Sequence, residues 1–175
     1  LYSQHTPLEE MPILAYLTGS RSTRSALLVP PAWSVAALLD KAEADGMRVT
    51  GALVTHYHQD HVGGLLRLPG MEMEIEGLAR LLERSPVPIY ANEREAAGLV
   101  RVAGISASDV KRKQAGDEIQ LGPVRVRLLH TPGHTPGSQC FLVEENGQPG
   151  KLVSGDTLFL GSCGRVDLPG SNVEE

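Results

Sequence analysis

The chain has 175 residues, of which 41% are hydrophobic and 21% are charged, and its formal net charge is −5. This balance is ordinary for a globular protein, and the length suits a single domain over residues 1–175 with a core of its own. The acidic balance, without any block of like charges, argues against a nucleic-acid partner. No apolar run approaches the roughly 20 residues that cross a bilayer, so we expect no membrane association.

The two ends and the two cysteines bear on the compartment. No basic segment followed by an apolar one opens the chain, so no secretory signal is visible, and we expect a cytoplasmic protein. Cys140 and Cys163 make no disulfide framework, and free thiols in a reducing compartment are the simpler interpretation. The chain starts at Leu1 without an initiator methionine and stops at Glu175 in what looks like the start of a further element. We therefore expect both ends to be trimmed.

The first half alternates strand-like and helix-like segments. Ser34 is a plausible N-cap for a helix in which Val35, Leu38, Leu39 and Ala42 recur at helical spacing, with Gly46 as its stop. A short helix is expected after His61. We further predict a hairpin of two strands at 11–19 and 25–30, and a strand at 48–55 before the histidines. After the histidines we predict a loop at 67–73, a helix at 74–85 and a strand at 87–91. A helix capped by Asn92 is expected at 92–104.

The second half is dominated by strands. In "DEIQLGPVRVRLLHT" two strands meet at Gly122-Pro123, and Val124, Val126 and Leu128 alternate with two arginines, which indicates one buried face. Two more strands, "SQCFLVEE" and "KLVSGD", surround the turn "NGQPG". Helices interleaved with strands, followed by strands alone, predict an α/β protein: an αββα sandwich with two sheet layers covered by helices.

The segment "THYHQDH" holds four potential metal ligands within six residues. At the end of an extended strand, residues two apart point the same way, so His56 and His58 can reach one point. Asp60 and His61 lie in the following turn and can reach a second point nearby. Imidazole and carboxylate ligands suit Zn²⁺, Fe or Mn. A set of merely solvated loop histidines is the alternative, and this density of ligands at a strand end disfavours it.

Further ligands must come from other strand ends. "LLHTPGHTPGS" offers His130 and His134 within Pro-Gly turns, and "LVSGDTLF" places Asp156 after an apolar strand. Each of these signals is weak alone, but three ligand-bearing strand ends in one domain indicate a metal centre. His5 has no supporting context, and we expect it to be an exposed residue near the terminus.

The pattern T-H-x-H-x-D-H, then H-T-P-G-H-T and G-D-T-L-F, resembles the metallo-β-lactamase superfamily. "GSCGRVDLPGS" is similar to the glyoxalase II-like branch and to its relatives, the persulfide dioxygenases. The likeness runs from "AYLTG" to "DLPGS" and implies the metallo-β-lactamase fold, whose C-terminal part would then lie beyond this chain. The first motif is highly specific for the superfamily, and the last is only moderately specific for the branch.

The resemblance carries the family's metal ligands onto individual residues. It implies that the first ion is bound by His56, His58 and His134, that the second is bound by Asp60 and His61, and that Asp156 bridges the two. Asp60, if weakly bound, also has a possible catalytic role in orienting the nucleophile or moving a proton. The resemblance assigns His130 a supporting rather than a ligating role, and relatives carry other residues at Cys163, which argues against a thiolate ligand.

Three features depart from the family or stay open. The family's last ligand to the second ion, a histidine in a late "PGH", has no counterpart here, so one or two ions are possible. Pro30 replaces a frequent aspartate and is expected to affect local structure rather than chemistry. The segment 65–86 is longer than the connection that usually follows the first motif in the family. It either forms a wall of the substrate site or is a neutral surface helix. Arg165 either binds a substrate carboxylate or pairs with Asp167, and we favour the pairing.

The leading hypothesis is a metallo-hydrolase with Zn²⁺, or alternatively Fe²⁺ or Mn²⁺, that cleaves a small glutathione-type thioester by attack of a metal-bound hydroxide. The runner-up is a mononuclear iron persulfide dioxygenase that uses His56, His134 and Asp156, the 2-His-1-carboxylate pattern. A lactonase or β-lactamase-type hydrolase is a further alternative, as is an inactive metal-binding relative. A nuclease is disfavoured by the acidic balance.

Overall fold

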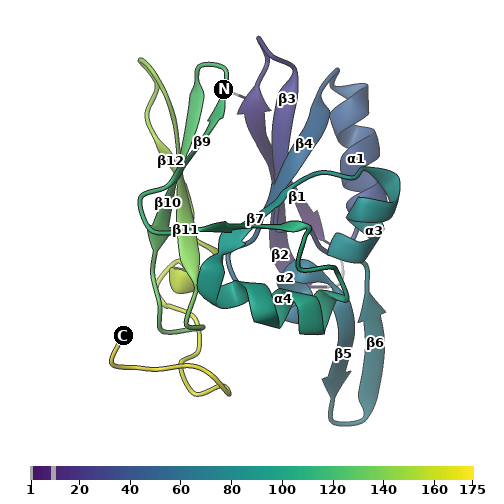
Figure 1. Ribbon diagram of the computed structural model, residues 1–175, viewed down its shortest axis with the longest axis vertical. Helices are drawn as coiled ribbons and strands as arrows, with labels where there is room; N and C mark the ends of the chain where they lie inside the picture. Colours follow the sequence, from purple (N-terminus) through teal and green to yellow (C-terminus); the bar gives the residue numbers. More distant parts are fainter. Residues whose placement is uncertain (1, 9–10) are drawn as a thin grey trace.

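The computed structural model describes the backbone of residues 2–8 and 11–175, and the side chains of 14–67 and 69–175. Two sheets lie face to face, with helices on the outer side of the larger one (Figure 1). The larger sheet has the strand order β1-β2-β3-β4-β7-β8, and the smaller has the order β12-β11-β10-β9. The helices α1, α3 and α4 pack on the larger sheet. This is the predicted metallo-β-lactamase arrangement of two facing sheets, and the larger sheet carries the outer layer of helices.

The strands of the larger sheet are β1 (Tyr2–Leu8), β2 (Met11–Ser20), β3 (Ser25–Val29), β4 (Arg48–Leu53), β7 (Ile89–Asn92) and β8 (Val110–Lys113). The first three are antiparallel, whereas β3, β4, β7 and β8 run parallel. The predicted hairpin, β2 with β3, is confirmed, but β1 and β8 were not predicted. The backbone of His5 lies in β1, and its side chain lies outside the described ones.

The smaller sheet is an antiparallel meander of β9 (Glu118–Leu121), β10 (Val124–His130), β11 (Gln139–Glu145) and β12 (Lys151–Val153). All four strands are where the sequence predicts them. Val124, Val126 and Leu128 are fully buried, while Arg125 is exposed. The alternation therefore marks the buried face correctly.

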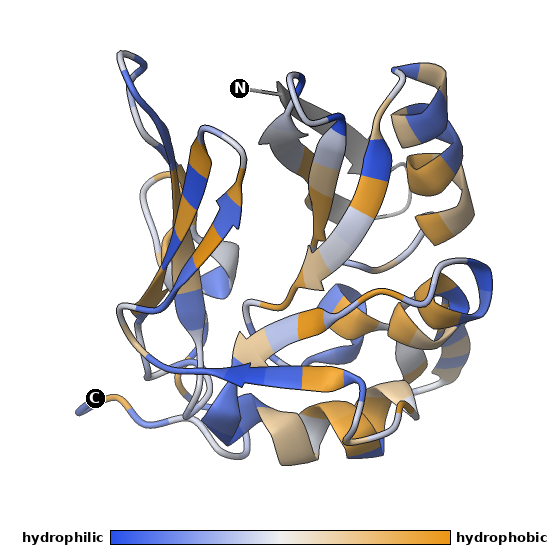
Figure 2. Ribbon diagram, turned by 45° about the horizontal axis from the view of Figure 1, so that its top comes forward, coloured by the Kyte–Doolittle hydropathy of each residue, from blue (hydrophilic) through white to orange (hydrophobic). Residues whose placement is uncertain are grey.

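Two hydrophobic clusters account for the layers. The first joins the larger sheet to α1 (Val35–Ala44), α3 (Leu78–Arg84) and α4 (Ala96–Ala103). The second joins Leu27, Val29 and Leu53 of the larger sheet to the inner face of the smaller one. Because neighbouring residues of a strand face opposite ways, β3 supplies both clusters. The apolar bands on the facing strands and on the covering helices follow this pattern (Figure 2).

The segment after the histidines differs from the prediction. The expected short helix after His61 is instead α2 (Gln59–Val62), which contains that histidine. The expected loop at 67–73 and the start of the expected helix at 74–85 form a hairpin of β5 (Gly64–Leu68) and β6 (Met71–Ile75), and the helix begins only at Leu78. Cross-strand pairing of "LLRL" with "MEMEI" overrides the weak helical spacing.

The turn into this hairpin explains the glycine pair of "HVGG". Gly63 and Gly64 have φ of +83° and +109°, values that L side chains rarely adopt. The backbone of Gly63 also packs directly on the backbone of Gly77, and a Cβ on either residue would collide with the other. The pair therefore lets the chain leave α2 and project the hairpin, which extends away from the sheets in Figure 1.

Candidate metal centre

The chemistry-bearing residues come from the ends of strands at one edge of both sheets. His56 and His58 follow β4, and α2 carries Asp60 and His61. His134 lies in the turn between β10 and β11, and Asp156 lies in a short 3-10 helix, η2 (Gly155–Thr157), after β12. Since β10 and β12 both run antiparallel to β11, their ends lie at the same edge of the smaller sheet. The topology brings together all six residues that the sequence singles out.

Three histidines converge on one point. The Nε2 atom of His134 lies 3.3 Å from Nε2 of His56 and 3.0 Å from Nδ1 of His58. The nitrogens of a tetrahedral zinc site lie roughly 3.4 Å apart, given Zn–N distances of about 2.0–2.1 Å. The observed spacing therefore fits a single ion among the three imidazoles. His56 and His134 are buried, whereas His58 is half-buried and gives access from outside.

A second group adjoins the first. Nε2 of His61 lies 3.6 Å from a carboxylate oxygen of Asp60 and 3.0 Å from Oδ1 of Asp156. The other oxygen of Asp156 lies 3.5 Å from Nε2 of His134. The two oxygens of Asp156 thus face the two groups, as a bridging carboxylate would. The donor set of imidazoles and carboxylates suits Zn, Fe or Mn.

The electrostatics of the site favour uncharged imidazoles. Burial first, and then the neighbouring His61, His58 and His134, hold the pKa of His56 well below its ordinary value of 6.5. Burial and His134 also lower the pKa of His58. Neutral imidazole is the form that binds metal, so these two residues are prepared as ligands without the loss of a proton.

The surroundings of Asp156 favour its charged form, whereas those of His56 and His58 favour the neutral form. Burial alone would raise its pKa, but the hydrogen bond with His61 and the charges of the surrounding histidines outweigh burial and lower the pKa. The carboxylate is therefore kept ionised, the state in which both oxygens can bind cations. Nδ1 of His61 is buried without a hydrogen-bond partner among the described residues.

Neighbouring groups fix the orientation of the imidazoles and of Asp60. Nδ1 of His56 lies 3.1 Å from Oγ1 of Thr55, and Nδ1 of His134 donates to the carbonyl of Arg165 at 2.7 Å. The indole of Trp33 donates to the carbonyl of Asp60 at 2.8 Å. The motif T-H-x-H-x-D-H includes Thr55, but sequence reasoning gave that residue no role. It missed Trp33 because no local pattern marks a contact between residues 27 positions apart.

The remaining predicted residues lie outside both groups. Nε2 of His130 donates to the carbonyl of Pro136 at 3.0 Å, which is a supporting role, as predicted. Cys140 is buried and Cys163 is exposed, and both are free thiols. Arg165 forms a bidentate pair with Asp167 at 2.8 and 2.9 Å, the favoured alternative. Its role in binding substrate stays a prediction.

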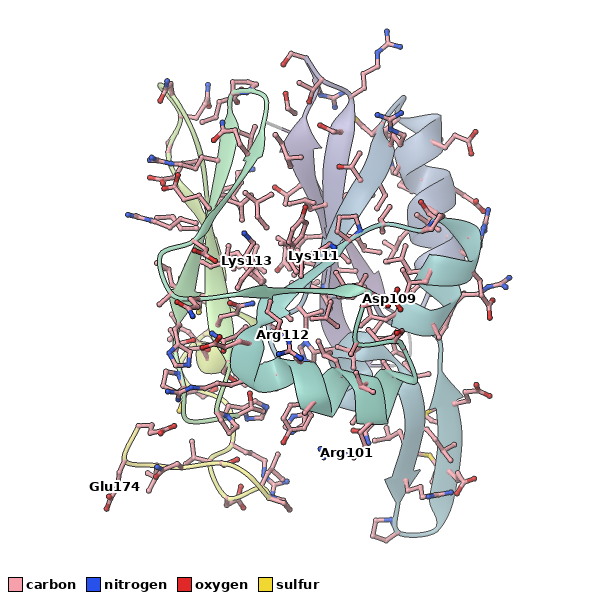
Figure 3. All side chains as sticks on the ribbon, in the orientation of Figure 1. Arg101, Asp109, Lys111, Arg112, Lys113 and Glu174 are labelled. Atoms are coloured by element: carbon pink, nitrogen blue, oxygen red, sulfur yellow. The ribbon has the colours of Figure 1, made fainter. Side chains whose placement is uncertain are left out.

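A tyrosine stands between the first two ligands. The ring of Tyr57 packs on the backbone of Gly98 in α4. The guanidinium of Arg101, which extends from the same helix in Figure 3, lies 5.7 Å from the centroid of that ring. Helix α4 therefore supports, from its outer side, the segment that carries His56 and His58.

Among the described residues, no helix combines the length and the hydropathy that a membrane crossing needs.

Comparisons with known proteins agree with the geometry. The family model of the metallo-β-lactamase superfamily matches residues 17–175. A hydroxyacylglutathione hydrolase of Synechococcus is 33% identical over 82% of this chain and 49% of its own. ETHE1 from Myxococcus xanthus superposes with a TM-score of 0.75 at 25% identity, over 98% of this chain and 64% of its own.

A third comparison concerns a metal-bound relative. The crystal structure of TTHA1623 in a di-iron-bound form superposes with a TM-score of 0.69 at 27% identity, over 98% of this chain and 80% of that one. By contrast, the chain spans between 38% and 49% of the length of the first three curated hydroxyacylglutathione hydrolases that it matches. The protein belongs to the metallo-β-lactamase superfamily, and its relatives fit the glyoxalase II-like branch.

Proposed function

We propose that the protein is a metal-dependent hydrolase of glutathione-type thioesters, with zinc as its metal and a cytoplasmic location. The observation that carries the proposal is the position of Asp156, whose two oxygens face the two groups of ligands. When two ions are bound in such a site, they supply hydroxide at neutral pH and a positive charge beside the leaving group. The hydroxyacylglutathione hydrolases among the relatives support the thioester as substrate.

The residues of this chain would bind the two metal ions, and one of them would also transfer a proton. His56, His58 and His134 would hold one ion, and Asp60, His61 and Asp156 the other. The side chain of Asp60 is 28% exposed, so it can meet the attacking water. We assign it the orientation of that water and the transfer of its proton.

The reaction needs no nucleophilic side chain. The oxygen of water forms a bond to the acyl carbon, the carbon–sulfur bond breaks, and the thiolate leaves and takes up a proton. The leaving thiolate is good, so hydroxide and a nearby positive charge suffice. Cys140 is buried and Cys163 lies outside both ligand groups, so neither offers an alternative nucleophile at the site.

A second candidate function is persulfide dioxygenation with one iron. Its support is that His56, His134 and Asp156 form a 2-His-1-carboxylate set on their own, with Nε2 of His134 at 3.3 Å from Nε2 of His56 and 3.5 Å from Oδ2 of Asp156. The similarity of "GSCGRVDLPGS" to the persulfide dioxygenases supports it as well. We favour the hydrolase, because Asp60 and His61 form with His56 a second set of potential ligands, and one iron would leave Asp60 and His61 unused.

Two assays on the purified chain separate these functions. We expect the zinc-loaded protein to consume S-lactoylglutathione and the iron-loaded protein to take up no oxygen with glutathione persulfide. His58→Ala should abolish turnover, whereas the control Glu93→Gln, at an exposed position outside both groups, should retain it. One iron per chain together with oxygen uptake would overturn the hydrolase proposal in favour of the dioxygenase.

A further inference from the structure

Glu95 is a fully buried carboxylate that the proposed chemistry does not use. It ends the short 3-10 helix η1 (Glu93–Glu95), just before α4, and its exposed fraction is 0%. Sequence reasoning treats it only as part of a helix. A buried carboxylate needs compensation, because removing an ionised group from water costs several kcal/mol unless hydrogen bonds or opposite charges replace the water.

The compensation for Glu95 comes from the two segments that carry the histidines. Oε2 accepts a hydrogen bond from the backbone N–H of Tyr57 at 2.8 Å. Oε1 accepts one from the backbone N–H of Gly137 at 2.7 Å and one from the hydroxyl of Thr135 at 2.9 Å. One carboxylate is therefore hydrogen-bonded to both segments, and each of its oxygens contacts a different segment; we call this bridging contact the grip of Glu95.

These contacts lie immediately beside the ligands. Tyr57 stands between His56 and His58, and Thr135 follows His134 directly. The grip therefore acts where the two histidine segments approach each other, and the nitrogens of His58 and His134 are 3.0 Å apart there. A shift of either segment would change that distance.

A purely structural role would be filled more cheaply by an apolar side chain. Replacing buried charged groups by well-packed hydrophobic ones is often neutral or stabilising. Burial raises the pKa of Glu95, and the hydrogen bonds from Thr135, Gly137 and Tyr57 act against that rise. The chain thus keeps a carboxyl group in a place where it is costly, and its three donors all belong to the histidine segments.

We propose that Glu95 is a positioning residue that sets the distance between the His56–His58 segment and the His134 segment, and thereby the geometry and affinity of the metal centre. The inference rests on the proposed metal centre but on neither of the two proposed reactions. It concerns support of the ligands and not contact with substrate.

The test is Glu95→Gln with Glu93→Gln as its matched control. The amide keeps the size of the carboxylate, but its NH₂ group must face one of the backbone N–H donors, so one side of the grip is lost. Glu93 lies two residues away on the same turn, is exposed, and has the same charge. The control therefore removes an equal charge without touching either histidine segment.

Zinc affinity and the ligand-field spectrum of the Co²⁺-loaded protein are the readouts. We expect Glu95→Gln to weaken zinc binding, measured by competition with a chelator, by about 10- to 100-fold, the range for groups that support metal ligands. Its Co²⁺ spectrum should differ from that of the wild type, while Glu93→Gln should match the wild type in both. An unchanged zinc affinity and spectrum in folded Glu95→Gln, with only a lower folding stability, would overturn the proposal.

A second variant approaches the same contact from the other side. A Cβ on Gly137 would lie 2.6 Å from Oε1 of Glu95, so Gly137→Ala must displace the carboxylate or its own segment. If Glu95→Gln fails to fold, Gly137→Ala provides the test. A zinc affinity at least about tenfold lower than that of the wild type supports the proposal, and an unchanged affinity overturns it. Zinc binding by the wild type without thioester cleavage would refute the hydrolase proposal and leave this inference intact.

Discussion

Nδ1 of His134 lies 2.7 Å from the carbonyl oxygen of Arg165, and this contact determines which ring nitrogen is free for a metal. A carbonyl only accepts hydrogen bonds, so Nδ1 carries the proton and Nε2 keeps its lone pair. Nε2 is also the atom that faces His56 and His58. The loop after η2 therefore orients a ligand that comes from a different strand end.

This arrangement predicts the tautomers of two histidines in the metal-free protein. We expect nitrogen NMR spectra at neutral pH to show His134 protonated at Nδ1. His130 is the internal control, because its Nε2 faces the carbonyl of Pro136 and should carry the proton instead. His134 protonated at Nε2 would contradict the orientation that we describe.

The contact between Gly98 and Tyr57 predicts an unusual response to alanine. A Cβ on Gly98 would lie 2.5 Å from Cγ of Tyr57, so Gly98→Ala must push the ring and the histidine segment that carries it. Alanine favours a helix over glycine by about 1 kcal/mol, yet overpacking costs about 1–3 kcal/mol. We expect lower stability in urea titrations and weaker zinc binding.

The control for this variant is Ala97→Gly, at an exposed position on the same helix. It should cost about 1 kcal/mol of stability through helix propensity alone and leave zinc affinity unchanged. Equal zinc affinities for the two variants would show that the packing of Tyr57 does not reach the ligands.

Trp33 supports the second group of ligands. Its indole donates to the carbonyl of Asp60 at 2.8 Å, and its backbone N–H donates to the carbonyl of Glu76. Trp33→Phe keeps an aromatic ring but removes the indole donor. In a stepwise zinc titration we expect the second ion to bind roughly tenfold more weakly and the first to bind as in the wild type. Equal weakening of both steps would argue against a local effect on Asp60.

The buried carboxyl of Glu95 predicts a pH dependence of stability. Its pKa is raised above the ordinary value of 4.5, chiefly by burial. The folded chain therefore keeps this proton at a pH where the unfolded chain has lost it, so the contribution to stability is full below about 4.5 and is lost as pH rises through the folded-state pKa.

Glu95→Gln has no such proton and provides the reference. In metal-free buffer, the free energy of unfolding of the wild type, minus that of the variant, should decline as pH rises from 4.5 and then level off. Urea titrations across this range measure the difference. A difference that is constant or that grows with pH would contradict a raised pKa.

Much of the site could be predicted because its ligands are local signals at strand ends. The strand before His56, the turn that holds His134 and the strand before Asp156 all follow from apolar runs that end in polar residues. Because β10 and β12 both run antiparallel to β11, the ends that carry His134 and Asp156 lie at one edge of the smaller sheet, which is a property of the topology. The spacing of "THYHQDH" indicated the two binding points, and the resemblance assigned His134 and Asp156 to them. The observed distances bring these residues together.

The parts that could not be predicted depend on contacts between distant segments. "MEMEI" pairs with "LLRL" as β6 with β5, although each segment alone gives only an ambiguous period. The strand β8 reads "VKRK" and forms the edge of the larger sheet, where Lys111, Arg112 and Lys113 in Figure 3 protect it from further pairing. Glu95 lies in a segment with no distinguishing pattern, and its role appears only when the two histidine segments are brought to it.

The most direct test of the proposed function is the turnover of S-lactoylglutathione by the zinc-loaded chain, compared with the same chain in which Asp156 is replaced by alanine. The wild type should cleave the thioester, stripping the metal should abolish cleavage, and restoring zinc should recover it. Asp156→Ala should reduce the rate by about 100-fold or more, because replacing even an outer-shell partner of a metal ligand typically costs about 10- to 100-fold in activity. Thioester cleavage that survives metal removal, or a zinc-loaded wild type without cleavage, would contradict the proposed function.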